Sequence, residues 1–122
     1  MKLNEYQELA LRTRNEGISQ PQELCNYALG LTGEAGEVAD LIKKGVFHGH
    51  EMNRHEIAKE IGDVLWYAAN LANLIGMSLE QVATMNVTKL MKRYPEGFSK
   101  EKSLERVDYA PSKKPGYMDL DD

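Results

Sequence analysis

The chain has little cysteine, few phenylalanines and no long apolar run. Its 122 residues include a single cysteine, Cys25, which excludes an internal disulfide and is typical of the reducing cytoplasm. No apolar stretch approaches the roughly 18 residues that a membrane span requires, and the first residues lack the apolar core of a signal peptide. These absences predict a cytoplasmic protein with no membrane partner.

An excess of basic residues is also lacking. The chain has 15 Lys and Arg against 19 Asp and Glu, which gives a formal net charge of -4 at pH 7. Binding to a nucleic acid polymer needs a basic surface that neutralises phosphates, so this composition argues against nucleic acid as the main partner. A small phosphorylated ligand held through metal ions remains compatible with the charge.

Strand signals are nearly absent, and helix signals divide the chain into four segments. Ser19 with Gln22 and Asn53 with Glu56 have the spacing of capping boxes, and Ser78 is a third capping residue. The predicted helices cover residues 3–15, 20–44, 55–75 and 79–93. From residue 99 onward the chain is polar and rich in Lys, Asp and Pro. We therefore predict an all-α fold, a four-helix bundle over residues 1–98, followed by a polar arm or disordered tail over residues 99–122.

Two pairs of acids carry the chemical signal. Glu34 and Glu37 are three residues apart, as are Glu60 and Asp63, so each pair lies about 60° apart on one helix face. One such pair alone is commonly a solvated surface feature. Two pairs on successive helices, each among glycines and apolar residues, indicate instead that four carboxylates converge on one site.

Converging carboxylates must bind cations or take up protons. An all-oxygen ligand set without histidine favours Mg²⁺, with Mn²⁺ as a substitute, and Mg²⁺ commonly shares its coordination shell with substrate phosphates. Glycines stand beside the acids in both segments, at Gly33, Gly36 and Gly62. Because each costs about 1 kcal/mol in a helix relative to alanine, we expect them to allow close helix approach or to leave room for metal and ligand.

Three segments resemble the MazG-like nucleoside triphosphate pyrophosphohydrolases, an all-α superfamily. They read "GEAGEVADLIKK", "EIAKEIGDVLWYAANLA" and "NVTKLMKRYPEGFS", and the resemblance covers about residues 20 to 98. It implies Mg²⁺-dependent cleavage of a nucleoside triphosphate between its α and β phosphates, which yields a monophosphate and pyrophosphate. The longer members often read "RHPHVF" where this chain has "RYPEGF", so their substrate preference does not transfer.

The resemblance also implies roles for particular residues. The four acids match the family's metal ligands, and Glu34 is the one we expect to activate the attacking water. Asn86, Lys89 and Arg93 match the stretch that contacts the triphosphate, although two cations near a helix end also suit its dipole. Further candidates for substrate binding, which rest on their positions in the helices, are Lys43, Tyr67 and Asn70.

The family further implies a homodimer or a homotetramer built as a dimer of dimers. Among substrates, the resemblance to short single-domain relatives favours the purines dGTP and GTP. The amides of Asn70 and Asn73 can both donate to and accept from guanine, as amides can with every base. Two other functions stay open at this level. The chain would then be a non-catalytic helical interaction module, or a pyrophosphohydrolase that acts on a phosphoribosyl nucleotide.

Overall fold

The computed structural model describes residues 1–109, and these residues form helices connected by short turns. The helices are α1 (Leu3–Leu11), α2 (Gln20–Phe47), α3 (Arg54–Leu74), α4 (Leu79–Arg93), α5 (Lys100–Glu105) and the 3₁₀ turn η1 (Val107–Tyr109). Within the described part of the chain there is no strand, only an isolated bridge between Pro95 and Gly97. The all-α fold class is confirmed. None of these helices is long and apolar enough to span a membrane.

The expected caps start three of the helices. Ser19 with Gln22 and Ser78 with Gln81 form reciprocal capping boxes at the starts of α2 and α4. Asn53 also caps α3, but its side chain accepts from the backbone N–H of His55, and the expected box with Glu56 is absent. The first helix ends at Leu11, four residues before the predicted end, and the second continues past Lys44 to Phe47.

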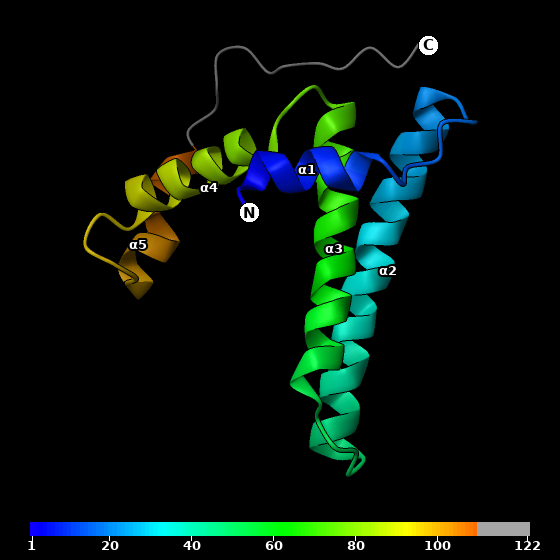
Figure 1. Ribbon diagram of the computed structural model, residues 1–122. Coiled ribbons are helices and arrows are strands. Elements are labelled where there is room, and N and C mark those ends of the chain that lie inside the picture. The colour runs from blue at the N-terminus through cyan, green and yellow to red at the C-terminus, as the bar shows by residue number, and fades with distance from the viewer. Residues whose placement is uncertain (110–122) are drawn as a thin grey trace.

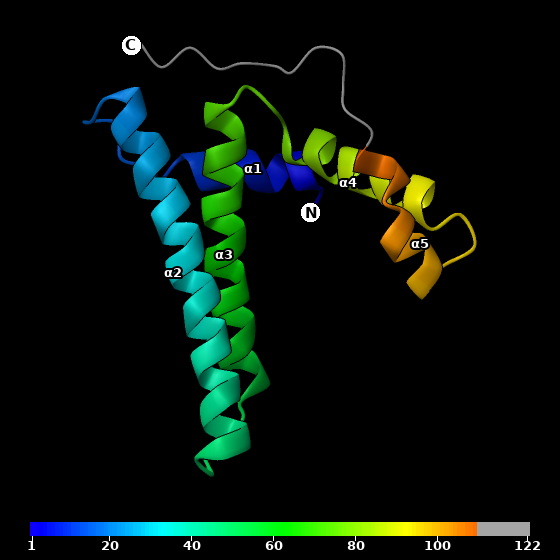
Figure 2. The ribbon, with the colours of Figure 1, turned by 180° about the vertical axis from the view of Figure 1, so that it is seen from behind.

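The two long helices α2 and α3 run antiparallel and side by side, while α1 crosses one end of the pair (Figure 1). Seen from either side, α4 and α5 extend away from the pair instead of lying along it (Figures 1 and 2). Within residues 1–109, α1, α3 and α4 meet at one end of this pair. In the same part of the chain, much of the length of α2, α3 and α4 has no helical neighbour on one side.

A small cluster where α1, α3 and α4 meet forms the core. Its buried members are Ala10, Ala69, Ala72 and Leu79, with Tyr6 and Trp66 packed against them. The small side chains allow α1 to cross α3 closely, and the indole of Trp66 donates to the hydroxyl of Thr13 at 2.9 Å. Within such a small core each polar contact has a large effect on how the helices are oriented.

Buried Gln7 joins the three helices by hydrogen bonds. Its amide nitrogen donates to the carbonyls of Ala69 and Met77, each at 3.1 Å, and its amide oxygen accepts from the N–H of Leu79 at 2.9 Å. These bonds satisfy backbone groups at the end of α3 and the start of α4. Gln7 therefore sets the direction in which α4 leaves the core.

Candidate active site

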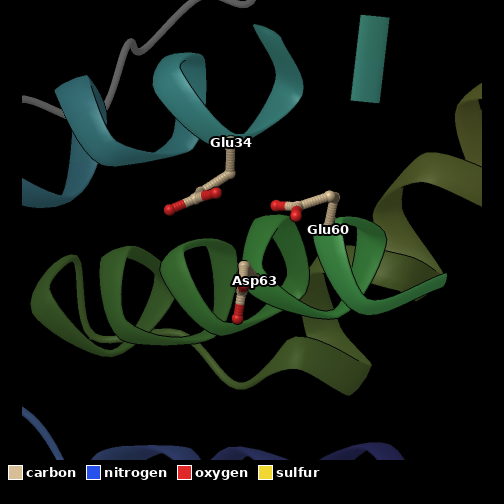
Figure 3. A group of neighbouring side chains, drawn as sticks. All are labelled: Glu34, Glu60 and Asp63. Atoms are coloured by element: carbon tan, nitrogen blue, oxygen red, sulfur yellow. The ribbon is translucent and has the colours of Figure 1, made fainter. Parts of the chain in front are cut away.

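Three of the four predicted acids come together between α2 and α3. Carboxylate oxygens of Glu34, Glu60 and Asp63 all lie within 4.8 Å of one another. Figure 3 shows Glu34 extending from α2 toward Glu60 on α3, with Asp63 one turn along α3. Within residues 1–109 this is the one group of three or more acids, histidines or cysteines with metal-ligand spacing. We refer to it as the acidic cluster.

The electrostatics of the acidic cluster follow from this convergence. Partial burial raises the pKa of the Glu34 carboxyl, and the negative charges of Asp63 and Glu60, with a hydrogen bond to Glu60, raise it further. A carboxyl in this setting holds its proton more tightly unless a cation neutralises its neighbours. The ligand set is all oxygen, which is the set that Mg²⁺ and Mn²⁺ prefer. The residues present therefore fit a divalent cation.

Glu37 lies outside the acidic cluster. It is exposed one turn beyond Glu34, close enough to raise the pKa of both Glu34 and Lys44 through its charge. The next acid on α2, Asp40, accepts from Lys44 and from Lys43, with the Lys43 contact at 3.3 Å. Hydrogen bonds from these two lysines lower the pKa of Asp40. Our sequence interpretation overlooked Asp40, although its position three residues after Glu37 continues the spacing of the acids.

Glycines beside the acids lie next to open space. A Cβ built on Gly33, Gly36 or Gly62 would meet no atom within 4 Å. We expected these glycines either to allow close helix approach or to leave room beside the acids. Close approach is therefore wrong at these three positions, and room beside the acids is the reason that remains. The close contact occurs at Gly30, where the ring of Tyr67 covers the α-carbon.

Tyr67 and Asn70 pack within the helix pair. The Tyr67 ring packs edge-on against Trp66, with centroids 5.0 Å apart, and lies close to the buried ring of Tyr27. Asn70 is 1% exposed, and its amide nitrogen donates to the carbonyl of Trp66. Its amide oxygen and the Tyr27 hydroxyl are buried without a protein hydrogen-bond partner. In this conformation Asn70 therefore lines no open surface.

The three candidates on α4 do not lie beside the acids. Asn86 and Lys89 are exposed on α4, which extends away from α2 and α3 (Figures 1 and 2). Arg93, at the end of α4, forms a two-pronged ion pair with Asp108. In contrast, Tyr6 of α1 does lie near the acidic cluster. Its hydroxyl is 3.4 Å from the carbonyl of Gly62, and burial together with the charge of Asp63 raises its pKa. No sequence signal pointed to Tyr6, because its contact depends on how α1 crosses α3.

Comparison with known proteins agrees with this helical fold. The model of the MazG nucleotide pyrophosphohydrolase domain matches residues 22–98. That match covers more than half of the chain, so the protein belongs to the MazG nucleotide pyrophosphohydrolase family, as the motifs indicated. It is similar to the Gene 37 protein of Mycobacterium phage L5, with 41% identity over 80 residues, covering 61% of this chain and 68% of that protein. No solved structure gives a significant match.

Proposed function

We propose that the protein is a Mg²⁺-dependent nucleoside triphosphate pyrophosphohydrolase. It would cleave the bond between the α and β phosphates of a ribo- or deoxynucleoside triphosphate, releasing the monophosphate and pyrophosphate. The supporting observation is the acidic cluster, which lies inside the segment that matches the family. Acids that converge from two helices repel one another, and a bound divalent cation would offset that repulsion.

Glu34, Glu60 and Asp63 are the proposed ligands of the metal, with exposed Glu37 as a fourth. A bound Mg²⁺ would neutralise phosphate charge and make a water more acidic, and Mn²⁺ would substitute for it. The chain's own residues would carry out the remaining steps of catalysis. Glu34 extends from α2 toward the two acids of α3 (Figure 3), and we assign to it the acceptance of the proton of the attacking water.

The leaving pyrophosphate requires cations that do not lie beside the acids in the same chain. Lys89 and Arg93 are one turn apart on α4, with Asn86 on the same face, so the three groups can contact successive phosphates. Lys43 is a further candidate, and its present partner is Asp40. Since α4 extends away from the acidic cluster (Figure 1), we propose that these cations reach the cluster of a second copy.

Exposed apolar side chains on α4 support this assembly. Met85 and Met91 are 60% and 66% exposed. A neighbouring groove of about 260 Å³ is lined by Val87, Leu90, Met91 and Tyr94. A helix face of this kind is normally covered, and the uncovered sides of α2 and α3 offer a complementary surface in another copy. A homodimer, or a homotetramer built from two dimers, would both cover this face of α4 and bring its cations to the acidic cluster of another copy.

For the nucleobase we propose a purine, with dGTP and GTP as the preferred substrates. Asn73 supports this choice, because it lines an open cavity of about 430 Å³ where α1, α3 and α4 meet. Its amide can accept from the N1–H of guanine and donate to O6. Asn70 would need a local rearrangement to do the same, since it is buried. Tyr67 remains a candidate for contact with the nucleoside.

One substrate panel tests the proposed reaction. The eight standard ribo- and deoxynucleoside triphosphates, together with phosphoribosyl-ATP, are incubated with enzyme and Mg²⁺, and pyrophosphate is measured. We expect release from nucleoside triphosphates, with kcat/KM highest for dGTP or GTP. The matched variants are Glu60→Gln, which should lose activity, and Glu56→Gln, an exposed acid one turn earlier on α3, which should keep it.

Two other outcomes would replace the proposal. Release only from phosphoribosyl-ATP would assign the enzyme to a phosphoribosyl nucleotide. No release from any compound would leave a helical interaction module whose acids bind a cation without catalysis. A preference of tenfold or more for dCTP or dUTP, about 1.4 kcal/mol in transition-state binding, would reject the purine choice alone.

A further inference from the structure

A carboxylate of the chain itself occupies the guanidinium of Arg93. Nε and one terminal nitrogen of Arg93 donate to the two carboxylate oxygens of Asp108, in η1. The side chain of Asp108 is 1% exposed and that of Arg93 is 13% exposed, so the pair is shielded from water. The hydrogen bonds from Arg93 lower the pKa of Asp108 to about 2. The contact is therefore an ion pair at neutral pH.

This ion pair joins η1 to the end of α4. In α5 no residue is buried, Leu104 is 86% exposed, and Val107 of η1 is 40% exposed. Within the described residues, a hydrogen bond between the side chains of Tyr94 and Ser103 also links this segment to the end of α4. A segment with little buried apolar surface opens at low free-energy cost. The contact between Arg93 and Asp108 is one that a competing anion can replace.

The edge of Arg93 that Asp108 occupies is the edge that recognises phosphate. A guanidinium offers two parallel N–H groups to a carboxylate or a phosphate in the same geometry. Arg93 also lies at the end of the face that carries Asn86 and Lys89. A polyphosphate bound along this face would meet Asp108 at its end, and the two anions would compete for one guanidinium.

We propose that Asp108 is a built-in competitor of the substrate, which the polyphosphate displaces from Arg93, so that nucleotide binding releases residues 99–109 from α4. This inference rests on the proposed function, which assigns Arg93 to the phosphates. Asp108 then lowers the affinity for nucleotide, because Arg93 must separate from Asp108 before it can bind a phosphate. It takes no part in bond cleavage, so its effect belongs to KM and not to kcat.

Amide hydrogen exchange of the wild-type protein tests the release directly. The probe is an analogue of dGTP with a methylene group between the α and β phosphorus atoms, added with Mg²⁺, and its binding is measured separately by calorimetry. We expect amides of residues 100–109 to exchange at least fivefold faster in the complex, while those of α2 and α3 slow down. Binding with unchanged or slower exchange in residues 100–109 would overturn the inference and leave the proposed function intact. Failure of the analogue to bind would reject both.

A pair of variants supplies the second measurement. Asp108→Asn keeps the shape of the side chain and removes its charge, so we expect at least a threefold lower KM with kcat unchanged. The control is Glu105→Gln in the same segment, whose exposed ion pair with Lys102 measures 3.0 Å and lies off the α4 face. It should leave both constants as they are. A purely structural role of Asp108 would lower stability without lowering KM, and an unchanged or higher KM would overturn the inference.

Discussion

Three glycines of α2 occur at intervals of three residues, yet the structure gives them different surroundings. A Cβ built on Gly30 would lie 2.1 Å from Cε1 of Tyr67, far inside van der Waals contact. A Cβ on Gly33 or Gly36 would meet nothing within 4 Å. Substituting each glycine by alanine therefore distinguishes the effect of side-chain packing on stability from the effect of helix propensity, within a single helix.

We expect Gly30→Ala and Gly33→Ala to change the free energy of unfolding in opposite directions. The Tyr67 ring cannot shift easily, because it lies against Trp66 and close to buried Tyr27. Overpacking of this kind outweighs the gain in propensity, so Gly30→Ala should lower the free energy of unfolding by about 2 kcal/mol. Gly33→Ala should raise it by about 0.5–1 kcal/mol. For a domain of this size each kcal/mol corresponds to roughly 4 °C in Tm.

Thermal and urea denaturation of the wild type and the three alanine variants measure these differences. Experiments run at one fixed protein concentration, so that any change in assembly does not distort the comparison. We expect Gly30→Ala to have the lowest Tm, with Gly33→Ala and Gly36→Ala at or above the wild type. If Gly30→Ala were as stable as Gly33→Ala, the packing of Tyr67 over Gly30 would be refuted.

Four more predictions follow from the site and the core. Asp63→Asn should lower kcat/KM at least 100-fold, as should chelation of the metal in the wild type, and near-normal rates would place the metal elsewhere. Gln7→Met removes three hydrogen bonds to backbone groups and should cost about 3 kcal/mol in urea unfolding, whereas a loss below 1 kcal/mol would contradict the bridging role. In the presence of a chelator, the protonated form of Glu34 stabilises the folded state, because folding raises the pKa of this carboxyl. This stabilisation is complete below the ordinary pKa of 4.5 and is lost as the pH rises through the raised pKa of the folded state. Glu34→Gln should therefore be the more stable protein at pH 7 but not at pH 4, and parallel pH profiles would count against the crowding of Glu34. Light scattering at micromolar concentration should show a dimer or tetramer that Met91→Glu dissociates and Lys92→Glu does not, and a fully active monomer would exclude the assembly.

The sequence by itself determined the helical class and the starts of α2, α3 and α4, whereas α5 lies in the segment that we expected to be a polar arm or disordered tail. Ser19 and Ser78 act through groups within three residues of each other, so their effect does not depend on distant parts of the chain. The pairing of acids is local in the same sense, because helical geometry alone places Glu60 and Asp63 on one side of α3. The motifs that carry these acids also sufficed to indicate the family.

Only the tertiary structure decided which groups meet. Glu34 joins the α3 acids while Glu37 does not, because the crossing of two helices selects one turn of α2 and helical spacing cannot. The direction of α4 depends on Gln7, which lies 72 residues before its partner Leu79. The ion pair of Arg93 with Asp108 joins α4 to a segment whose composition indicated only a polar arm. Contacts of this kind depend on distances between elements, and a one-dimensional pattern of charge and hydrophobicity does not contain them.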